Sequence, residues 1–116
     1  MVHATFEVTA NNFQTQVLGA NVPVLVEFGA DWCPPCKMLA PTVHALATKY
    51  SDKMHVGIMD SDAYPELVQR YGVMGLPTLI LFQNGKPVAR MVGFQPKDRI
   101  EAQIVPYLQT EIVNPR

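Results

Sequence analysis

The chain reads FGADWCPPCKML over residues 28–39, where an apolar run of strand length meets a run with helical spacing. This stretch holds the only two cysteines, Cys33 and Cys36, in the spacing Cys-x-x-Cys. If a helix begins at Cys33 or Pro34, both sulfurs lie on one side of it, one turn apart. A disulfide needs Cβ atoms roughly 3.5–4.5 Å apart, which this spacing allows. The first turn of a helix also stabilises a thiolate, the form of cysteine that attacks disulfides. The stretch therefore predicts a dithiol redox centre.

Two other interpretations of the cysteine pair are a structural disulfide and half of a zinc site. Zinc takes about four ligands, and the sequence has no second cysteine pair. The nearest histidine along the helix, His44, stands two turns beyond Cys36, too far to share a metal ion. The cytosol keeps ordinary thiols reduced, so a close pair in that setting favours redox chemistry over a structural role.

Length and composition fit one compact domain over residues 1–116, with residues 109–116 expected to form a flexible tail. Hydrophobic residues make up 48% of the 116 residues, enough for a core. The 9 basic and 10 acidic residues form no basic cluster, which argues against nucleic acid and membrane surfaces as partners. The N-terminus has neither the basic nor the apolar region of a secretory signal. Apolar runs fall short of the roughly 18 residues of a spanning helix, and a cytoplasmic location is expected.

The hydrophobic patterns predict an α/β fold. Strands are expected at residues 2–8, 24–28, 54–59, 78–82 and 87–92, and helices after Asn12, over 34–50, from Pro65 and from Pro96. Asn84-Gly85 between two apolar runs predicts a tight antiparallel hairpin. Pro41 is expected to kink its helix, and Pro106 to bend or end the last one. This order predicts a mixed central sheet of about five strands flanked by about four helices.

Single residues inside these patterns carry further predictions. Glu27 is a lone acid inside the apolar strand Val24–Phe28, which favours a buried carboxylate with a functional role over a strand-edge carboxylate facing water. Trp32, beside Cys33, is expected to offer contact surface rather than packing alone. Five methionines are expected to fill the core, namely Met38, Met54, Met59, Met74 and Met91.

Several motifs together resemble the thioredoxin family. They are Trp32-Cys33-Pro34-Pro35-Cys36-Lys37, Val26-Glu27-Phe28, Pro41, Tyr71-Gly72-Val73, Gly75-Leu76-Pro77-Thr78, Phe82-Gln83-Asn84-Gly85 and Val92-Gly93. The similarity runs from about residue 5 to residue 108. Cys-x-x-Cys alone is a weak signal, but its combination with the downstream Gly-Leu-Pro-Thr and Asn-Gly segments is specific.

This resemblance implies a protein-disulfide reductase with a redox-active disulfide between Cys33 and Cys36 and no bound cofactor. Cys33 is implied as the exposed nucleophile, and Cys36, more buried, as the thiol that resolves the mixed disulfide. Glu27 is implied as a buried carboxylate beneath Cys36 that relays its proton. Pro77 is implied as a cis-proline opposite the cysteines. The implied substrate-binding residues are Trp32, Pro34, Pro35, Gly75, Leu76, Pro77, Gly93 and Phe94.

The implied partners are disulfide-containing protein substrates and a thioredoxin reductase, which would carry the flavin and NADPH. A monomer is expected. The implied role is electron transfer in the redox balance of the cell.

Four positions depart from the commonest bacterial pattern of this family. Pro34 stands in place of a glycine, Gly29 in place of a tryptophan, and Glu27 in place of an aspartate. Ile58 falls where a lysine often lies near the buried acid. A buried acid without a nearby cation is expected to have a raised pKa, because desolvation is left uncompensated.

Other functions remain open at this point. The Pro-Pro pair also resembles tryparedoxin-type and nucleoredoxin-type relatives, and Pro34 leaves room for a more oxidising disulfide oxidase or isomerase. A different class is a co-chaperone or regulatory binding module. Its docking surface would be an apolar patch around Trp32, Leu76 and Phe94, and its redox state would only gate association.

Overall fold

A five-stranded sheet in the order β1-β3-β2-β4-β5 forms the centre of the computed structural model, which describes residues 4–108. The strands are β1 (Thr5–Val8), β2 (Val24–Gly29), β3 (His55–Asp60), β4 (Thr78–Gln83) and β5 (Lys86–Val92). β3 pairs with β1 and β2 in parallel, while β4 pairs with β2 and β5 in antiparallel orientation. The predicted mixed sheet is confirmed. The expected tail at residues 109–116 and the expected strand residue Val2 lie outside the described residues.

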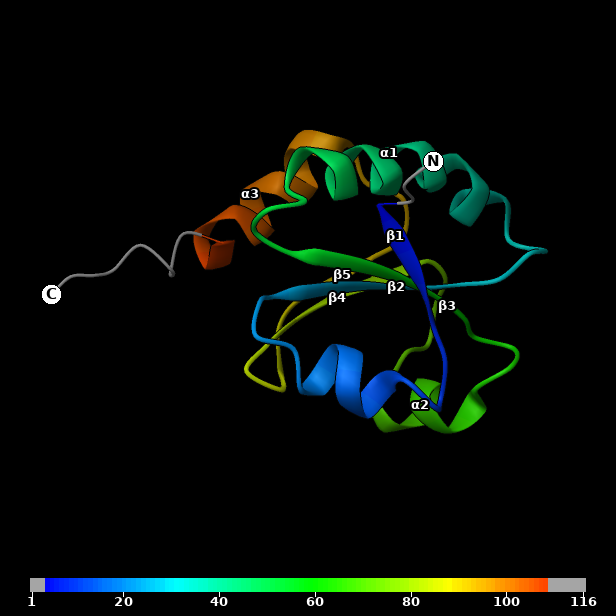
Figure 1. Cartoon of the computed structure of the whole chain (residues 1–116). Helices are drawn as coiled ribbons and strands as arrows, with labels where there is room; N and C mark the ends of the chain where they lie inside the picture. Colours follow the sequence, from blue (N-terminus) through cyan, green and yellow to red (C-terminus); the bar gives the residue numbers. More distant parts are fainter. Residues whose placement is uncertain (1–3, 109–116) are drawn as a thin grey trace, which may run out of the picture.

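Helices cover both faces of this sheet (Figure 1). They are η1 (Phe13–Leu18), α1 (Pro34–Lys49), α2 (Pro65–Arg70) and α3 (Lys97–Leu108). α1 and α3 lie on one face, and η1 and α2 lie on the other. No helix among residues 4–108 has both the length and the apolar character needed to cross a membrane.

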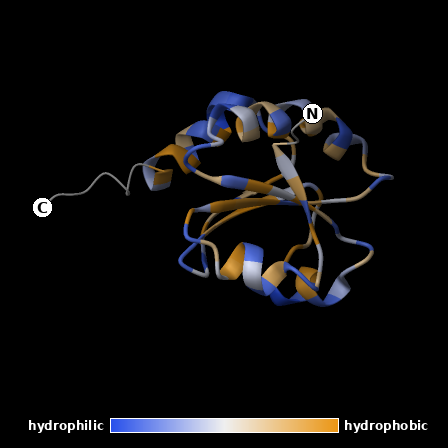
Figure 2. Ribbon diagram, viewed as in Figure 1, coloured by the Kyte–Doolittle hydropathy of each residue, from blue (hydrophilic) through white to orange (hydrophobic). Residues whose placement is uncertain are grey.

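Alternation along the strands divides the core into two layers. On β2, Leu25 faces the layer built with α1 and α3, whereas Val24, Val26 and Phe28 face the layer built with η1 and α2. Apolar colour follows the strands and the inner sides of the helices (Figure 2). Because side chains alternate between the two faces of a strand, Glu27 lies on the Leu25 side, beneath α1. The position of this acid in the sequence therefore directs it toward the helix that carries the cysteines.

The turn and cap residues behave as their chemistry predicts. Asn84 and Gly85 have φ angles of 54° and 79°, the left-handed values of a two-residue hairpin turn. Gly72, just beyond α2, has φ of 64°, where a glycine ends a helix at low cost. Pro106 does not end the last helix, since α3 continues to Leu108. A proline this close to the last turn removes a single backbone hydrogen bond, which is a small loss for a helix packed on the core.

The first helix differs from its expected form. η1 is a π-helix, and Asn12 at its N-cap makes no side-chain hydrogen bond to it. Instead, Asn12 Oδ1 accepts from the backbone N–H of Thr9 at 2.8 Å, and Asn12 Nδ2 donates to the carbonyl of Glu7 at 2.7 Å. The asparagine therefore stabilises the turn between β1 and η1 rather than the helix. Asparagine side chains compete for backbone groups in this way, which sequence position alone does not decide.

Replacing Gly57 by alanine is expected to destabilise the fold by about 1–3 kcal/mol, because it overpacks a filled site. A Cβ atom on Gly57 in β3 would meet Val8 Cγ2 and would lie 2.9 Å from Phe6 Cζ. Urea denaturation measures the effect. The matched control is Gly75→Ala, whose Cβ would have Val92 Cγ1 at 3.6 Å, an ordinary contact. Equal urea midpoints for the two variants would contradict the packing argument.

Candidate active site

The cysteine pair lies where β2 leads into α1. α1 begins at Pro34, with Cys33 as its N-cap, as the sequence predicts. A disulfide bond joins Cys33 and Cys36, whose Cα atoms are 5.3 Å apart. The backbone N–H of Cys36 donates to Cys33 Sγ at 3.2 Å. Pro34 and Pro35 occupy the first two helical positions and have no N–H, so Cys36 supplies the first available donor of the helix.

The two sulfur-bearing side chains are both buried in this disulfide form. Cys33 exposes 2% of its surface and Cys36 exposes 6%. The expectation that Cys33 is exposed and Cys36 is the more buried of the two is therefore wrong for the oxidised protein. The physical reason is the cap geometry. Cys33 Sγ turns back onto the first turn of α1, where Cys36 covers it through both the disulfide and the N–H contact.

Glu27 lies beside this disulfide and is buried, with 4% of its surface exposed. A Cβ atom built on Gly29 would lie 3.1 Å from Glu27 Oε2 and 3.4 Å from Cys36 Sγ, so the carboxylate and the sulfur border the same small space. Burial raises the pKa of Glu27 from 4.5 to about 7 through desolvation. The predicted burial of this acid is confirmed.

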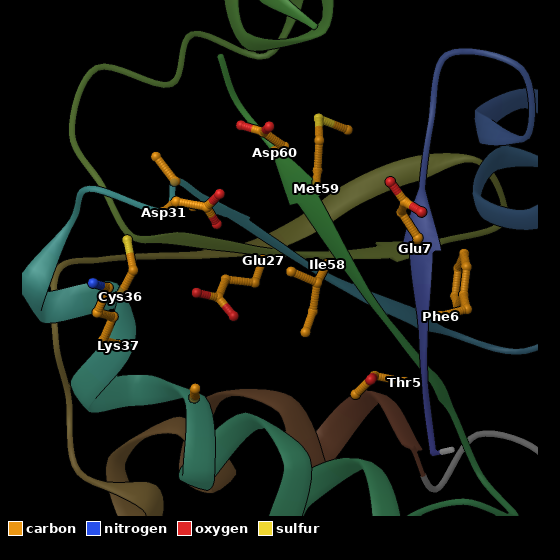
Figure 3. Close-up of a pocket in the computed structure, with 13 residues that line it drawn as sticks. Thr5, Phe6, Glu7, Glu27, Asp31, Cys36, Lys37, Ile58, Met59 and Asp60 are labelled. Atoms are coloured by element: carbon orange, nitrogen blue, oxygen red, sulfur yellow. The ribbon is translucent and has the colours of Figure 1, made fainter. Parts of the chain in front are cut away.

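Ile58 and Gly29, two of the positions that differ from the commonest bacterial pattern, leave Glu27 without a neighbouring charge. Ile58 is the register partner of Glu27 on β3 and brings no charge to it. Gly29 brings no side chain, and a Cβ there would already press on the Glu27 carboxylate. A cavity of about 500 Å³ opens beside these residues, between the sheet and the first half of α1 (Figure 3). The expected pKa increase at the buried acid therefore has its predicted cause, which is uncompensated desolvation.

The cis-proline segment meets the cysteine segment at one end of the inner strands β2 and β4. The Leu76–Pro77 peptide bond is cis. Phe28 at the end of β2 pairs with Thr78 at the start of β4, which places Pro77 next to the strand end that leads to Cys33. The N–H of Gly93 donates to the carbonyl of Pro77 at 2.7 Å. The sequence-predicted residues at 75–77 and at 93–94 therefore lie together at this end of the sheet.

The side chains around the cysteines and the cis-proline differ in how much of their surface is exposed. Trp32 exposes 64% and Phe94 exposes 46% of its surface, whereas Leu76 is half-buried and Pro77 is buried. Pro34 is exposed and Pro35 is half-buried at the start of α1. The expected contact surface at Trp32 is present as exposed apolar area next to the cysteines.

Sequence reasoning missed one residue at this site. Trp32 Nε1 donates to Asp62 Oδ2 at 2.7 Å, which fixes the orientation of the exposed indole. Asp62 follows β3 and stands thirty residues along the chain from Trp32. Acids often follow the end of a strand, so the position of Asp62 in the sequence does not indicate a contact with Trp32. The contact becomes apparent only from the parallel pairing of β2 and β3.

The methionine prediction is partly wrong. Met54, Met59 and Met91 are buried, but Met38 exposes 63% and Met74 exposes 97% of its surface. Met38 lies on the outer side of α1, and Met74 lies in the loop before the cis-proline segment. A flexible, exposed apolar side chain offers adaptable contact area, and hydrophobicity alone does not separate that role from core packing.

The described part of the chain has no set of side chains that could coordinate a metal ion. Among residues 4–108, no group of three or more histidine, cysteine, aspartate or glutamate side chains could hold a metal ion.

Comparison with known proteins places the chain in a family. A family model described as Thioredoxin matches residues 4–105. The chain is 44% identical over 106 residues to a thioredoxin of Alicyclobacillus acidocaldarius, covering 91% of this chain and all 100% of that protein. It is 47% identical over 94 residues to a thioredoxin of Mycobacterium tuberculosis, covering 81% of each chain. It is also 45% identical over 93 residues to a "Bifunctional thioredoxin reductase/thioredoxin" of Mycobacterium leprae, covering 80% of this chain and 20% of that protein. The chain belongs to the thioredoxin family and is a thiol–disulfide oxidoreductase with the Cys-x-x-Cys pair of that family.

Proposed function

We propose that this chain reduces protein disulfides with Cys33 as the attacking thiolate and Cys36 as the resolving thiol. Cys33 attacks one sulfur of the substrate disulfide, and the other substrate sulfur leaves and takes up a proton. Cys36, deprotonated, then attacks Cys33 Sγ in the mixed disulfide. The second substrate sulfur leaves, and the Cys33–Cys36 disulfide forms. Two electrons pass from the dithiol to the substrate.

The observation that carries this assignment is the hydrogen bond at the start of α1. Cys36 N–H donates to Cys33 Sγ at 3.2 Å, and Cys33 is the N-cap of a 16-residue helix. A donor N–H and the positive end of a helix both favour a thiolate over a thiol, and they act on Cys33. Cys36 sits inside the helix beside a carboxylate, which disfavours a second negative charge there.

Glu27 is proposed as the base for the second step. Its carboxylate borders the same space as Cys36 Sγ, and burial raises the pKa of Glu27 to about 7. A base with a pKa near the working pH is best suited to accept a proton and to return it. Cys36 must lose a proton before it attacks, so Glu27 is expected to act on the resolving step.

Replacing Glu27 by glutamine is therefore expected to prolong the mixed disulfide, on the order of 10²-fold, while the first attack changes little. Trapping the mixed disulfide by acid quenching and mass spectrometry measures its lifetime. The matched control is Glu66→Gln, which removes one exposed carboxylate on α2. A mixed-disulfide lifetime that is equal in the wild type and in Glu27→Gln would exclude the proton-relay role.

Substrate docking is proposed at the end of β2 and β4, where the cis-proline segment and the cysteines meet. A substrate segment in extended form would pair with the backbone of Leu76 and pack against Trp32 and Phe94. The remaining contacts are proposed at Pro34, Pro35, Gly75, Pro77 and Gly93. Exposed aromatic surface beside a backbone edge suits many sequences, because the backbone contacts do not depend on the side chains. This docking surface is therefore suited to unrelated proteins that share an accessible disulfide.

The dithiol is proposed to be restored by a thioredoxin reductase. The Mycobacterium leprae relative carries both functions in its name, which supports a partnership of this kind. Flavin and nicotinamide would belong to that partner, because thiol–disulfide exchange at Cys33 and Cys36 requires no cofactor on this chain. A monomer in the cytoplasm is proposed, where such a reductase keeps a close cysteine pair reduced.

Equilibration with glutathione, followed by a reductase-coupled insulin assay, tests this function. A reductase is expected to lie nearer to the roughly −270 mV typical of thioredoxins than to the roughly −180 mV of disulfide isomerases. The second value would favour the oxidase or isomerase alternative, for which Pro34 is the structural argument.

A binding module is a second candidate because Trp32 and Phe94 are exposed. The binding-module function is favoured if a variant with both Cys33→Ser and Cys36→Ser captures partner proteins as well as the wild type does.

A further inference from the structure

The cavity beside Glu27 has features of a ligand site that disulfide exchange does not use. Its volume is about 500 Å³, within the range of small-molecule sites. Its walls come from β1, β3 and the first half of α1, and Glu27 reaches from β2 into the space between the sheet and α1 (Figure 3). Apolar wall is supplied by the side chains of Ile58 and Ala40, whereas the Phe6 ring packs on the opposite face of the sheet. The cavity therefore combines an apolar lining with a buried acid.

The Glu27 carboxylate has no protein partner in the described part of the chain. Burial leaves 4% of this residue exposed, yet no described side chain or backbone N–H forms a hydrogen bond or ion pair with it. Among residues 4–108, Ser61 Oγ is the one side-chain oxygen that lacks both a hydrogen-bond partner and contact with open space, so the unpaired Glu27 oxygens border the open volume of the cavity. Glu27 faces the cavity, so a partner would enter through it.

The charges around the cavity are unbalanced. Besides Glu27 on β2, carboxylates come from Glu7 on β1, Asp31 before α1 and Asp60 at the end of β3, while Lys37 on α1 is the one basic residue of the lining. Glu7, Asp31, Asp60 and Lys37 are exposed and their charges are screened by solvent, whereas Glu27 is buried. The excess of acids, with the one buried charge among them, favours a cation over an anion.

We propose that this cavity binds a small organic cation, with its amine or guanidine head on the Glu27 carboxylate and its apolar body against Ile58 and Ala40. A guanidinium or ammonium group supplies the donors that Glu27 lacks, and charge-assisted hydrogen bonds of this kind are about twice as strong as neutral ones. A metal ion is not suited to the site, because the carboxylates of the lining do not come together as a group of three or more that could hold one, as is true throughout residues 4–108.

The ligand would also act on the chemistry next to it, an effect that rests on the proposed function. A carboxylate paired with a cation is a weaker base, so it accepts the Cys36 proton less readily. Occupation of the cavity is expected to slow the resolving step and to leave the first attack unchanged. Binding itself is measured on the oxidised protein, which performs no exchange, so it succeeds or fails independently of the proposed function.

The test uses n-butylguanidinium as the probe and N-butylurea as its neutral match, each titrated into the oxidised protein and followed by amide NMR. Saturable shifts are expected at residues 27–31, 36–40 and 58–60 with n-butylguanidinium, and at least tenfold weaker binding with N-butylurea. Binding to the ionised carboxylate is expected to be about tenfold tighter at pH 8 than at pH 6, because burial holds the pKa of Glu27 at about 7.

Three variants make the test decisive. Glu27→Gln is expected to weaken n-butylguanidinium binding at least tenfold, and Ala40→Leu, which fills the cavity from α1, is expected to weaken it as well. Glu66→Gln removes an exposed acid away from the cavity and is expected to change nothing. Equal affinity in the wild type and in both cavity variants, or equal affinity for the urea, would overturn the proposal. Shifts confined to residues outside the cavity would overturn it too.

Discussion

Insulin reduction by dithiothreitol is expected to fall to the uncatalysed rate when Cys33 is replaced by serine. A serine hydroxyl in the same N-cap position accepts the Cys36 N–H as the sulfur does, so the helix start is kept. The hydroxyl is not ionised near neutral pH and does not attack disulfides, and the first step is lost entirely. Turbidity of the precipitating insulin chains measures the rate.

Cys36→Ser provides the matched control because it removes the second step alone. That variant is expected to attack a substrate disulfide once and then to remain bound to it, giving a mixed disulfide that mass spectrometry detects. Cys33→Ser is expected to give none. Wild-type turnover in Cys33→Ser, or mixed disulfides at Cys36 in place of Cys33, would reverse the roles assigned to the two sulfurs.

Apolar runs of strand length, apolar residues at helical spacing and turn residues were enough to predict most of the fold. Asn84-Gly85 specifies the hairpin because its φ angles are accessible to few other pairs, and Pro34 specifies the start of α1 because it has no N–H to lose. Burial of Glu27 also followed from sequence, since an acid inside an apolar central strand has no exposed face to turn to. These features depend on local chemistry, which the sequence displays directly.

The rest of the site depends on contacts between distant segments. The bond from Trp32 to Asp62 exists because β2 and β3 are parallel neighbours whose ends meet, and no local pattern encodes it. The burial of Cys33 follows from how the disulfide lies on the first turn of α1, which the spacing of the cysteines does not specify. The cavity arises where Gly29 and Ile58 meet at Glu27, and its volume depends on all three walls at once.

The stability of the oxidised protein is expected to depend on pH through Glu27. Burial raises the pKa of Glu27 from 4.5 to about 7, so the folded state holds a proton that the unfolded state releases. Between these values the folded state binds more protons, and stability therefore falls as the pH rises from about 4.5 to about 7. A shift of this size corresponds to a loss on the order of 3 kcal/mol, complete above about pH 8. The carboxylate destabilises the fold at the pH where the proposed proton transfer needs it.

Glu27→Gln removes this titration while keeping the shape and polarity of the side chain. Its free energy of unfolding is expected to exceed that of the wild type by about 3 kcal/mol at pH 8.5, with the two proteins converging near pH 4. Urea denaturation at both values, with the disulfide closed, gives the difference. Glu101, paired with Lys49, has a lowered pKa and acts in the opposite direction, but its contribution is common to both proteins and cancels. A wild-type and variant difference that stays constant from pH 4 to pH 8.5 would mean that Glu27 is ionised without cost in the fold. Another group of the protein would then stabilise the ionised Glu27 carboxylate.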